Sequence, residues 1–335
     1  MVSCCCKIPI FVFIFLLLVI SSSICATHSS ETGNSQANNQ TFRPEEESKK
    51  LKLVRERLNK INKPALKTIQ AINLICLTCR SPLFAFYCVL LRHQPAFDHP
   101  KLKGKKPLDP PESPNGHNRK GMAAEDFQMW MMSGESCPEG TIPIRRTTEG
   151  DMLRASSVAS FGKKPTRLVR RDSTSDGHES QGFEKRLQLS ANRVKHAVGY
   201  VSGDEYYGAK ANINVWAPRV SNQYEFSLSQ LWVISGSFGD DLNTIEAGWQ
   251  VSPELYGDYY PRFFTYWTSD AYQATGCYNL LCSGFVQTNN RIAIGAAISP
   301  TSSYGGGQFD ISLLVWKVNL VPPPNYYTNK MFTNL

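Results

Sequence analysis

The sequence lacks the motifs that mark the common nucleophilic hydrolases and nucleotide-dependent enzymes. It contains no Gly-x-Ser-x-Gly turn and no cysteine and histidine arranged as a nucleophile and its base, which disfavours hydrolysis through a covalent acyl-enzyme. No Gly-x-x-x-x-Gly-Lys-Ser/Thr loop is present to bind nucleotide phosphates. The Cys76-x-x-Cys79 pair has neither a second such pair nor two histidines at ligand spacing. The sequence therefore predicts neither a metal nor another cofactor.

Aromatic residues are scarce where positive charge is concentrated. The formal net charge of +8 comes mainly from lysine and arginine between residues 49 and 195, in runs such as 101–106 and 167–171. These runs lie in stretches rich in Pro, Ser and Gly, which are typical of a solvated linker and not of a folded basic face. Nucleic acid is therefore not expected as a partner.

Long apolar runs are also few, and the first has the features of a signal peptide. Residues 1–26 contain Lys7, an apolar stretch at 8–20 and the small residues that usually precede a cleavage site. The stretch is shorter than the roughly 20 residues that span a membrane. We expect a secreted, extracellular protein, cleaved near Cys25 or Ala26, with no stable membrane span afterwards.

A second apolar run at 71–91 contains Arg80 and Pro82, which disfavour a transmembrane helix. The sequence Asn39-Gln40-Thr41 predicts glycosylation of Asn39. Outside the leader, cysteines in an oxidising compartment are expected to pair. The candidates are Cys76, Cys79, Cys88, Cys137, Cys277 and Cys282.

The remaining chain divides by composition into four parts. Residues 45–140 form a pro-region that begins with an amphipathic helix limited by Pro64, and residues 141–195 read as a polar linker. Within that linker, the dibasic pair Arg170-Arg171 is a candidate processing site. Residues 196–317 form a β-rich domain, and residues 318–335 a divergent tail.

The β-rich domain predicts an all-β fold. Its short segments of aromatic and β-branched residues are separated by Gly, Pro, Asn, Asp or Ser turns, a pattern typical of an antiparallel β-sandwich or barrel. The expected strands are 197–207, 209–216, 230–235, 244–251, 262–267, 284–287, 291–298 and 309–316.

The β-rich region contains the segments 230–233 (QLWV), 244–251 (TIEAGWQV), 266–270 (YWTSD) and 275–287 (TGCYNLLCSGFVQ). The pro-region contains 58–69 (LNKINKPALKTI) and 94–100 (QPAFDHP). The first set resembles the catalytic domain of the neprosin family of glutamic peptidases, whose peptidase members are prolyl endopeptidases, and the second set resembles the family's activation peptide.

The resemblance implies a proenzyme with an antiparallel β-sandwich domain that cleaves proline-containing peptides after proline, using two glutamates. Two carboxyl groups that share a site differ in proton affinity, so one can activate water while the other protonates the leaving amine. By motif match, the first catalytic residue is Glu246. The family also implies a disulfide between Cys277 and Cys282, and contact of the domain with its own propeptide.

Alternation along the strand puts Glu246, Gly248 and Gln250 on one face, which we expect to be polar and unobstructed. Gly248 would then allow a peptide backbone to approach. Gln230 and Trp232 are candidate neighbours in the cleft, although a packing role for Trp232 fits equally well.

The C-terminus departs from the family. The second glutamate is expected in strands that follow Trp-Trp and Gly-Tyr-Trp-Pro-type motifs, and nothing like these follows Trp316. No motif supports a substitute among Glu225, Glu254, Asp258 and Asp270. We therefore expect a C-terminally truncated chain that is inactive or folds poorly, with a sheet edge left uncovered.

The alternative is a secreted β-sandwich without catalytic activity that binds carbohydrate or a proline-rich wall protein. Aromatic side chains on one sheet could stack on sugar rings or on polyproline. The candidates are Tyr256, Tyr259, Tyr260, Tyr266 and Trp267.

Overall fold

The structure is a computed structural model, and it describes residues 44–71, 84–105, 107, 114, 127–164, 197–203, 205–236, 241–318 and 330–334. The expected signal peptide, the sequon at Asn39, the Arg170-Arg171 pair and the pair Cys76 and Cys79 lie outside these residues. The chain divides into two compact units, Met1–Glu46 and Glu47–Leu335. The second unit contains the strands and the site described below.

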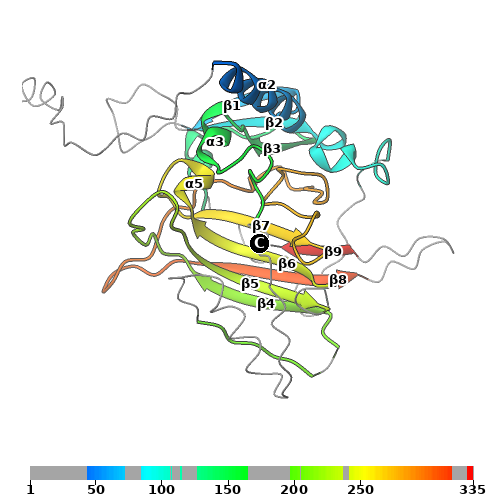
Figure 1. Cartoon of the computed structure of the whole chain (residues 1–335). Helices are drawn as coiled ribbons and strands as arrows, with labels where there is room; N and C mark the ends of the chain where they lie inside the picture. The colour runs from blue at the N-terminus through cyan, green and yellow to red at the C-terminus, as the bar shows by residue number, and fades with distance from the viewer. Residues whose placement is uncertain are drawn as a thin grey trace, which may run out of the picture. The chain divides into compact units, whose positions relative to one another are not determined.

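The described residues are mostly β, with antiparallel sheets and few helices, as the sequence predicts. The N-terminal part of the second unit forms a sheet of order β1-β2-β3 (Figure 1). Its strands are β1 (Ala65–Ala71), β2 (Phe84–Leu90) and β3 (Thr141–Arg145). Its helical segments are α2 (Pro44–Ile61), η1 (Leu91–His93), η2 (Pro95–Asp98), η3 (Met129–Ser133) and α3 (Glu149–Arg154).

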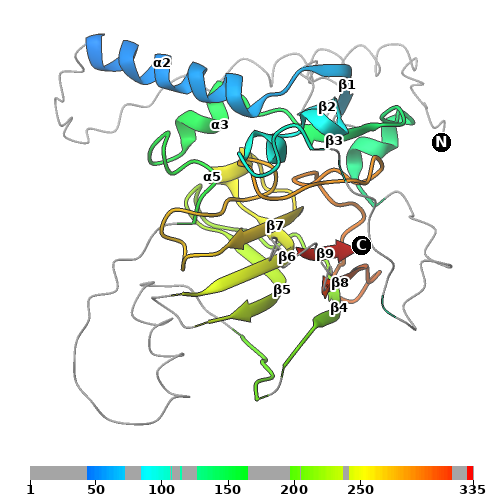
Figure 2. The ribbon, with the colours of Figure 1, turned by 90° about the vertical axis from the view of Figure 1, so that its right-hand side faces the viewer.

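Helix α2 has the apolar stripe that its sequence predicts. Val54 and Ile61 are buried and share a cluster with Met152 of α3 and with Phe161. Figure 2 shows α3 beside α2. The structure differs from the expected linker here, because residues 141–164 form β3, α3 and a turn that pack with the rest of the unit. Burial of Met152 and Phe161 gives this polar segment the apolar contacts that it lacks locally.

The C-terminal part consists of two further antiparallel sheets. One has the order β5-β6-β7 and the other the order β4-β8-β9. The elements are β4 (Gly208–Asn214), β5 (Ser227–Ser235), β6 (Asn243–Val251), α5 (Pro253–Tyr256), β7 (Arg262–Thr268), β8 (Asp310–Val318) and β9 (Lys330–Asn334).

Three of the expected strands are not strands in the structure. Residues 197–203 and 205–207 precede β4 without pairing, residues 284–287 are irregular, and residues 291–298 form only isolated bridges such as Ile144 with Ile294. The 291–298 segment is apolar because it is buried, with Ala293 and Ala296 fully covered. Burial without regular pairing gives the same residue pattern as a core strand.

The two C-terminal sheets contribute to one hydrophobic core, an arrangement compatible with a sandwich. Ile213 and Leu313 come from β4 and β8, while Trp249 and Phe263 come from β6 and β7. The same core includes Val89 of β2 and Ile142 of β3. Through Val89, the pro-region packs into the core of the domain that it precedes.

Two buried glutamines of the pro-region form hydrogen bonds with the backbone of the β-rich domain that resemble those between paired β-strands. The Gln94 amide donates to the carbonyl of Gln287 (2.9 Å) and accepts from its backbone N–H (2.7 Å). The Gln128 amide makes the same two contacts with Ala293, both at 2.8 Å. These bonds satisfy backbone groups that would otherwise be buried without partners.

The apolar run at 71–91 enters the fold through β2, which pairs with both β1 and β3. Cys88 of β2 forms a disulfide with Cys137. Among the residues that the structure describes, no helix has the length and apolar character required to cross a membrane.

The divergent tail contributes β9, which pairs antiparallel with β8. We expected the edge of the last sheet to be uncovered, and the structure instead places β9 on it. Strand pairing uses backbone groups, so a divergent segment can supply it. The three consecutive prolines, 322–324, lie outside the described residues.

Candidate functional site

Glu246 lies on the middle strand of the sheet β5-β6-β7 (Figure 1). In the antiparallel register it is opposite Trp232 of β5 on one side and Tyr266 of β7 on the other. Directly opposite residues in an antiparallel sheet project from the same face. The three side chains therefore form a row across the sheet.

The Glu246 carboxylate is buried, with 0% of the residue exposed. Its Oε1 accepts hydrogen bonds from the hydroxyls of Tyr272 (2.9 Å) and Thr244 (3.3 Å), and its Oε2 forms an ion pair with Lys164. These contacts correct the expectation of an unobstructed polar face. A carboxylate removed from water requires such partners, because an unpaired buried charge is costly.

Lys164 comes from the segment before the β-rich domain, and its ammonium group lies among three aromatic rings. The Nζ atom is 4.9 Å from the ring centroid of Tyr266, 5.6 Å from that of Tyr272 and 5.8 Å from that of Trp232. Its backbone N–H donates to the Tyr266 hydroxyl at 3.2 Å. The carboxylate and the rings thus surround a single cation.

Tyr272 reaches Glu246 from a tight turn after β7. Both Ala271 (φ 53°) and Tyr272 (φ 64°) have left-handed backbone conformations, which cost energy in residues other than glycine. Asp270 holds the turn by accepting hydrogen bonds from the backbone N–H groups of Ala274 and Thr275, each at 2.9 Å. Burial alone would raise the pKa of Asp270, but these bonds and the Thr275 hydroxyl lower it overall.

Besides burial, the negative charge of Glu246 contributes to the raised pKa values of two neighbouring phenols, those of Tyr266 and Tyr272. Burial is the main cause that raises the pKa of Tyr266 to about 12, and the charges of Glu246 and Asp270 add to it. Burial, followed by the charge of Glu246, also raises the pKa of Tyr272 well above its ordinary value. Both phenols therefore remain protonated, and Tyr272 acts as a hydrogen-bond donor to the carboxylate.

The structure separates the other two residues on the Glu246 face from the carboxylate. A Cβ atom at Gly248 would lie 2.0 Å from the backbone oxygen of Ser229, so this glycine permits close packing against β5 and does not open a path for a peptide. The Gln250 amide donates to the Tyr256 hydroxyl at 2.9 Å. Four strand positions separate Gln250 from Glu246, which is about 13 Å.

Of the candidate neighbours on β5, Trp232 contributes a ring to the Lys164 environment and Gln230 pairs in register with Gly248. Lys164, Tyr272 and Thr244 were not among the predicted site residues. Lys164 is 82 positions from Glu246, and no local pattern indicates such a contact.

Residues 223–320 match the family model described as Neprosin, and residues 85–200 match the one described as Neprosin activation peptide. The chain belongs to the neprosin family. The first match contains Glu246 and the second contains Lys164. The ion pair between them therefore joins the activation-peptide region to the neprosin domain, and the chain is a neprosin-like peptidase precursor.

A second neprosin-type acid is not present beside Glu246 in the described part of the chain, where the partners of its carboxylate are two hydroxyls and one ammonium. Asp258 is paired with Arg262 at 2.7 Å, and Asp270 accepts a hydrogen bond from the backbone N–H of Ala274 in its own turn. Glu225 accepts from the backbone N–H of Ser221 at 2.7 Å. None of the four acids considered from the sequence, which include Glu254, contacts Glu246.

The disulfide between Cys277 and Cys282 is present and lies close to the incoming segment. Within the loop that it closes, the backbone N–H of Tyr278 donates to the carbonyl of Gly162 at 2.8 Å. The loop thereby supports the chain that delivers Lys164.

The proposed aromatic surface for sugar binding is not formed. Tyr256 and Tyr266 are buried, with 3% and 2% of the residue exposed, whereas Tyr259 is 55% exposed. Buried rings cannot stack on a sugar, so the structure does not favour this alternative.

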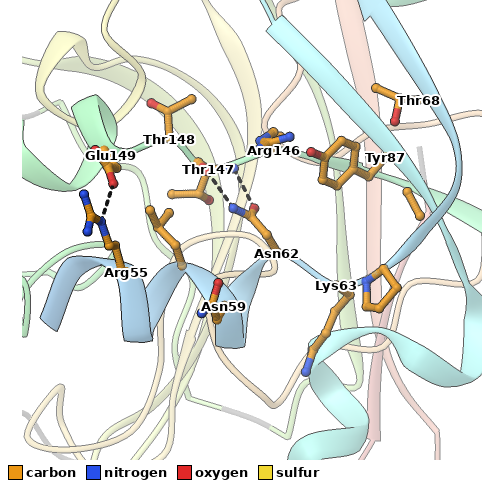
Figure 3. A pocket seen from close by; sticks show the side chains of 13 residues that line it. Arg55, Asn59, Asn62, Lys63, Thr68, Tyr87, Arg146, Thr147, Thr148 and Glu149 are labelled. Atoms are coloured by element: carbon orange, nitrogen blue, oxygen red, sulfur yellow. Dashed lines mark hydrogen bonds and ion pairs between the residues drawn. The ribbon is translucent and has the colours of Figure 1, made fainter. Parts of the chain in front are cut away.

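A cavity of about 810 Å³ lies between α2, the start of β1 and residues 146–149, and Figure 3 shows the side chains that line it. Asn62 connects two sides of the cavity, because its amide donates to the carbonyl of Thr147 at 2.7 Å and accepts from the backbone N–H of Thr147 at 2.9 Å. Arg55 and Glu149 pair across it at 3.3 Å. None of its lining residues belongs to the Glu246 site, so its size alone does not make it the functional site.

Proposed function

We propose that this neprosin-like precursor is secreted, that Glu246 is one member of the family's glutamate pair, and that the chain does not hydrolyse peptides because no second carboxyl group lies beside Glu246 among the residues that the structure describes. The family resemblance supports proline-containing peptides as the substrate class of the complete enzyme. The observation that carries the proposal is the set of groups around the Glu246 carboxylate.

Amide hydrolysis by carboxyl groups needs one base to activate water and one acid to protonate the leaving amine. Among the described residues, no second carboxyl group contacts Glu246 to serve as that acid. The pKa of Tyr272 is raised by burial and by Glu246, which makes its phenol a poor proton donor. Loss of general acid catalysis costs roughly 10²–10⁴ in rate.

Lys164 also keeps the site closed. Its ammonium group occupies the position next to Glu246 that an attacking water would need, and only 22% of its side chain is exposed. The occupation of the site by Lys164 and the lack of a second acid are therefore separate obstacles to hydrolysis. An experiment has to remove the Lys164 side chain before it can test whether the second acid is lacking.

The test compares the wild-type chain with the variants Lys164→Ala, Lys163→Ala and Lys164→Ala/Glu246→Gln on proline-containing peptides at acidic and neutral pH. We expect no cleavage from any of them, although Lys164→Ala opens the site. Cleavage by Lys164→Ala that disappears in the double variant would show that a working acid exists, and the proposed inactivity would be wrong. Near-UV circular dichroism verifies that each variant is folded.

Secretion is tested separately by expressing the chain with its own leader in plant cells. The proposal predicts a protein in the medium that begins after Cys25 or Ala26, as read by N-terminal sequencing. Retention of an uncleaved chain inside the cell would contradict it.

A further inference from the structure

The groups around the Lys164 ammonium form a pocket that is complete without the lysine. Trp232, Glu246 and Tyr266 lie on three adjacent paired strands. Tyr272 lies on the turn after β7, where its backbone N–H donates to the Thr268 hydroxyl at 2.9 Å. Each lining group is therefore positioned by the β-rich domain, while the occupant comes from another segment.

The chemistry of this pocket is that of a cation receptor. Aromatic faces within about 6 Å attract an ammonium group through the ring quadrupole, and the attraction is stronger away from water. The buried Glu246 carboxylate supplies the opposite charge, and its hydrogen bonds to Tyr272 and Thr244 keep it in place. Three rings and one carboxylate select a primary ammonium over an uncharged group of the same shape.

The contacts of the neighbouring backbone show how a peptide presents its lysine to the pocket. The Lys164 N–H donates to the Tyr266 hydroxyl, and two residues earlier the Gly162 carbonyl accepts from Tyr278. Gly162 has a φ of +74°, and a Cβ atom there would lie 2.6 Å from Leu281. The site therefore favours a lysine that follows a glycine by two positions.

We propose that the Glu246 pocket is a binding site for the lysine side chain of a peptide, and that Lys164 is its resident ligand. The inference rests on the proposed function in one respect, because it assumes that a peptide reaches Glu246. It changes the role of Glu246 in this chain from activating water to holding an ammonium group. Binding is measured without hydrolysis, so the two proposals can fail separately.

The first experiment removes the Lys164 side chain and supplies its ammonium group as a small molecule. In the full chain carrying Lys164→Ala the pocket has lost its occupant, and n-propylammonium contains the same heavy atoms as the part of the side chain that was removed. We expect saturable binding by calorimetry, at least tenfold tighter than that of n-propanol, and a concentration-dependent rise in the thermal unfolding midpoint. Wild type and Lys163→Ala retain Lys164 and should bind at least tenfold more weakly. Lys164→Ala/Glu246→Gln should also lose at least tenfold.

Equal affinity for the charged and uncharged probes would overturn the proposal, as would equal binding by wild type or no effect of Glu246→Gln. If Lys164→Ala does not fold, Lys164→Met retains the aliphatic stem. This variant should unfold at a lower temperature than wild type, and the difference should disappear in a Glu246→Gln background. A difference that persists in that background would overturn the proposal.

A second experiment uses the wild-type chain. Brief acylation followed by mass spectrometry should modify Lys163 at least tenfold faster than Lys164, because only Lys164 is held in the pocket. Glu246→Gln should reduce that difference. Equal modification of the two lysines in wild type would show that Lys164 does not occupy the pocket.

Discussion

At the scale of single residues, two buried carboxylates have different roles. Glu246 contacts one cation and two hydroxyls, whereas Asp151 forms ion pairs with Arg145 and Arg154 and accepts a hydrogen bond from the backbone N–H of Thr148, the N-cap of helix α3. Burial raises the pKa of Asp151, but Arg145, the Thr148 backbone N–H and Arg154 outweigh it and lower the pKa overall. The charged form of Asp151 is therefore favoured in the folded protein.

The lowered pKa fixes the sign of a pH effect. A group whose pKa is lower in the folded state stabilises the protein above its unfolded pKa, about 3.9 for aspartate, and loses that contribution as the pH falls through the folded value. Asp151→Asn should cost roughly 3 kcal/mol of unfolding free energy at neutral pH, since it leaves the partly buried guanidinium groups of Arg145 and Arg154 without a carboxylate partner. The cost should shrink below about pH 4.

Urea unfolding at several pH values measures both effects. Asp98→Asn is the matched control, because the Lys63–Asp98 pair has a carboxylate that is 55% exposed. Exposed pairs contribute about 1 kcal/mol or less. If Asp151→Asn were no more destabilising than Asp98→Asn at neutral pH, the assigned role of Asp151 would be wrong.

At the scale of elements, the turn after β7 stores backbone strain to deliver Tyr272. Ala271 has a positive φ, a backbone conformation that its Cβ atom makes unfavourable and that glycine adopts readily. We expect Ala271→Gly to raise the unfolding free energy by about 1 kcal/mol through relief of this strain. The denaturation midpoint followed by tryptophan emission measures the change.

Ala274 lies in the same turn and does not have a positive φ. Ala274→Gly should therefore lower stability by about 0.4–1 kcal/mol, because glycine has more freedom in the unfolded chain. A higher unfolding free energy for Ala271→Gly together with a lower one for Ala274→Gly would support backbone strain at Ala271. Destabilisation by both would indicate that the left-handed conformation at Ala271 costs nothing.

At the scale of the whole molecule, the pro-region is a structural part of the fold. It shares a core with the β-rich domain through Val89, and it supplies Gln94 and Gln128 to buried backbone groups of that domain. We therefore expect the described part of the chain to unfold in one cooperative transition.

Gln94→Ala should reveal this coupling. It removes both partners of the Gln287 backbone, which is buried, and leaves an N–H and a carbonyl unsatisfied at a cost of about 1–3 kcal/mol each. Hydrogen exchange at the Gln287 amide should accelerate. The control Gln70→Ala changes an exposed side chain and should have little effect. An unchanged exchange rate in Gln94→Ala would contradict the coupling.

The sequence by itself determined the apolar stripe of α2, the strands β4 to β8 within a few residues, and the position of Glu246 on its strand. These features depend on neighbours a few positions apart, which repeat with the period of a helix or a strand. The motifs around Glu246 also indicated the neprosin family before any geometry was known.

Only the tertiary structure decided what surrounds Glu246. Lys164 is 82 positions away, Tyr272 depends on a strained turn, and Gly248 packs against a neighbouring strand and does not line a cleft. The alternation correctly placed Glu246 on a strand, but it could not reveal that the face would be covered. Burial is a property of the packed chain, because it depends on which distant segment lies over that face.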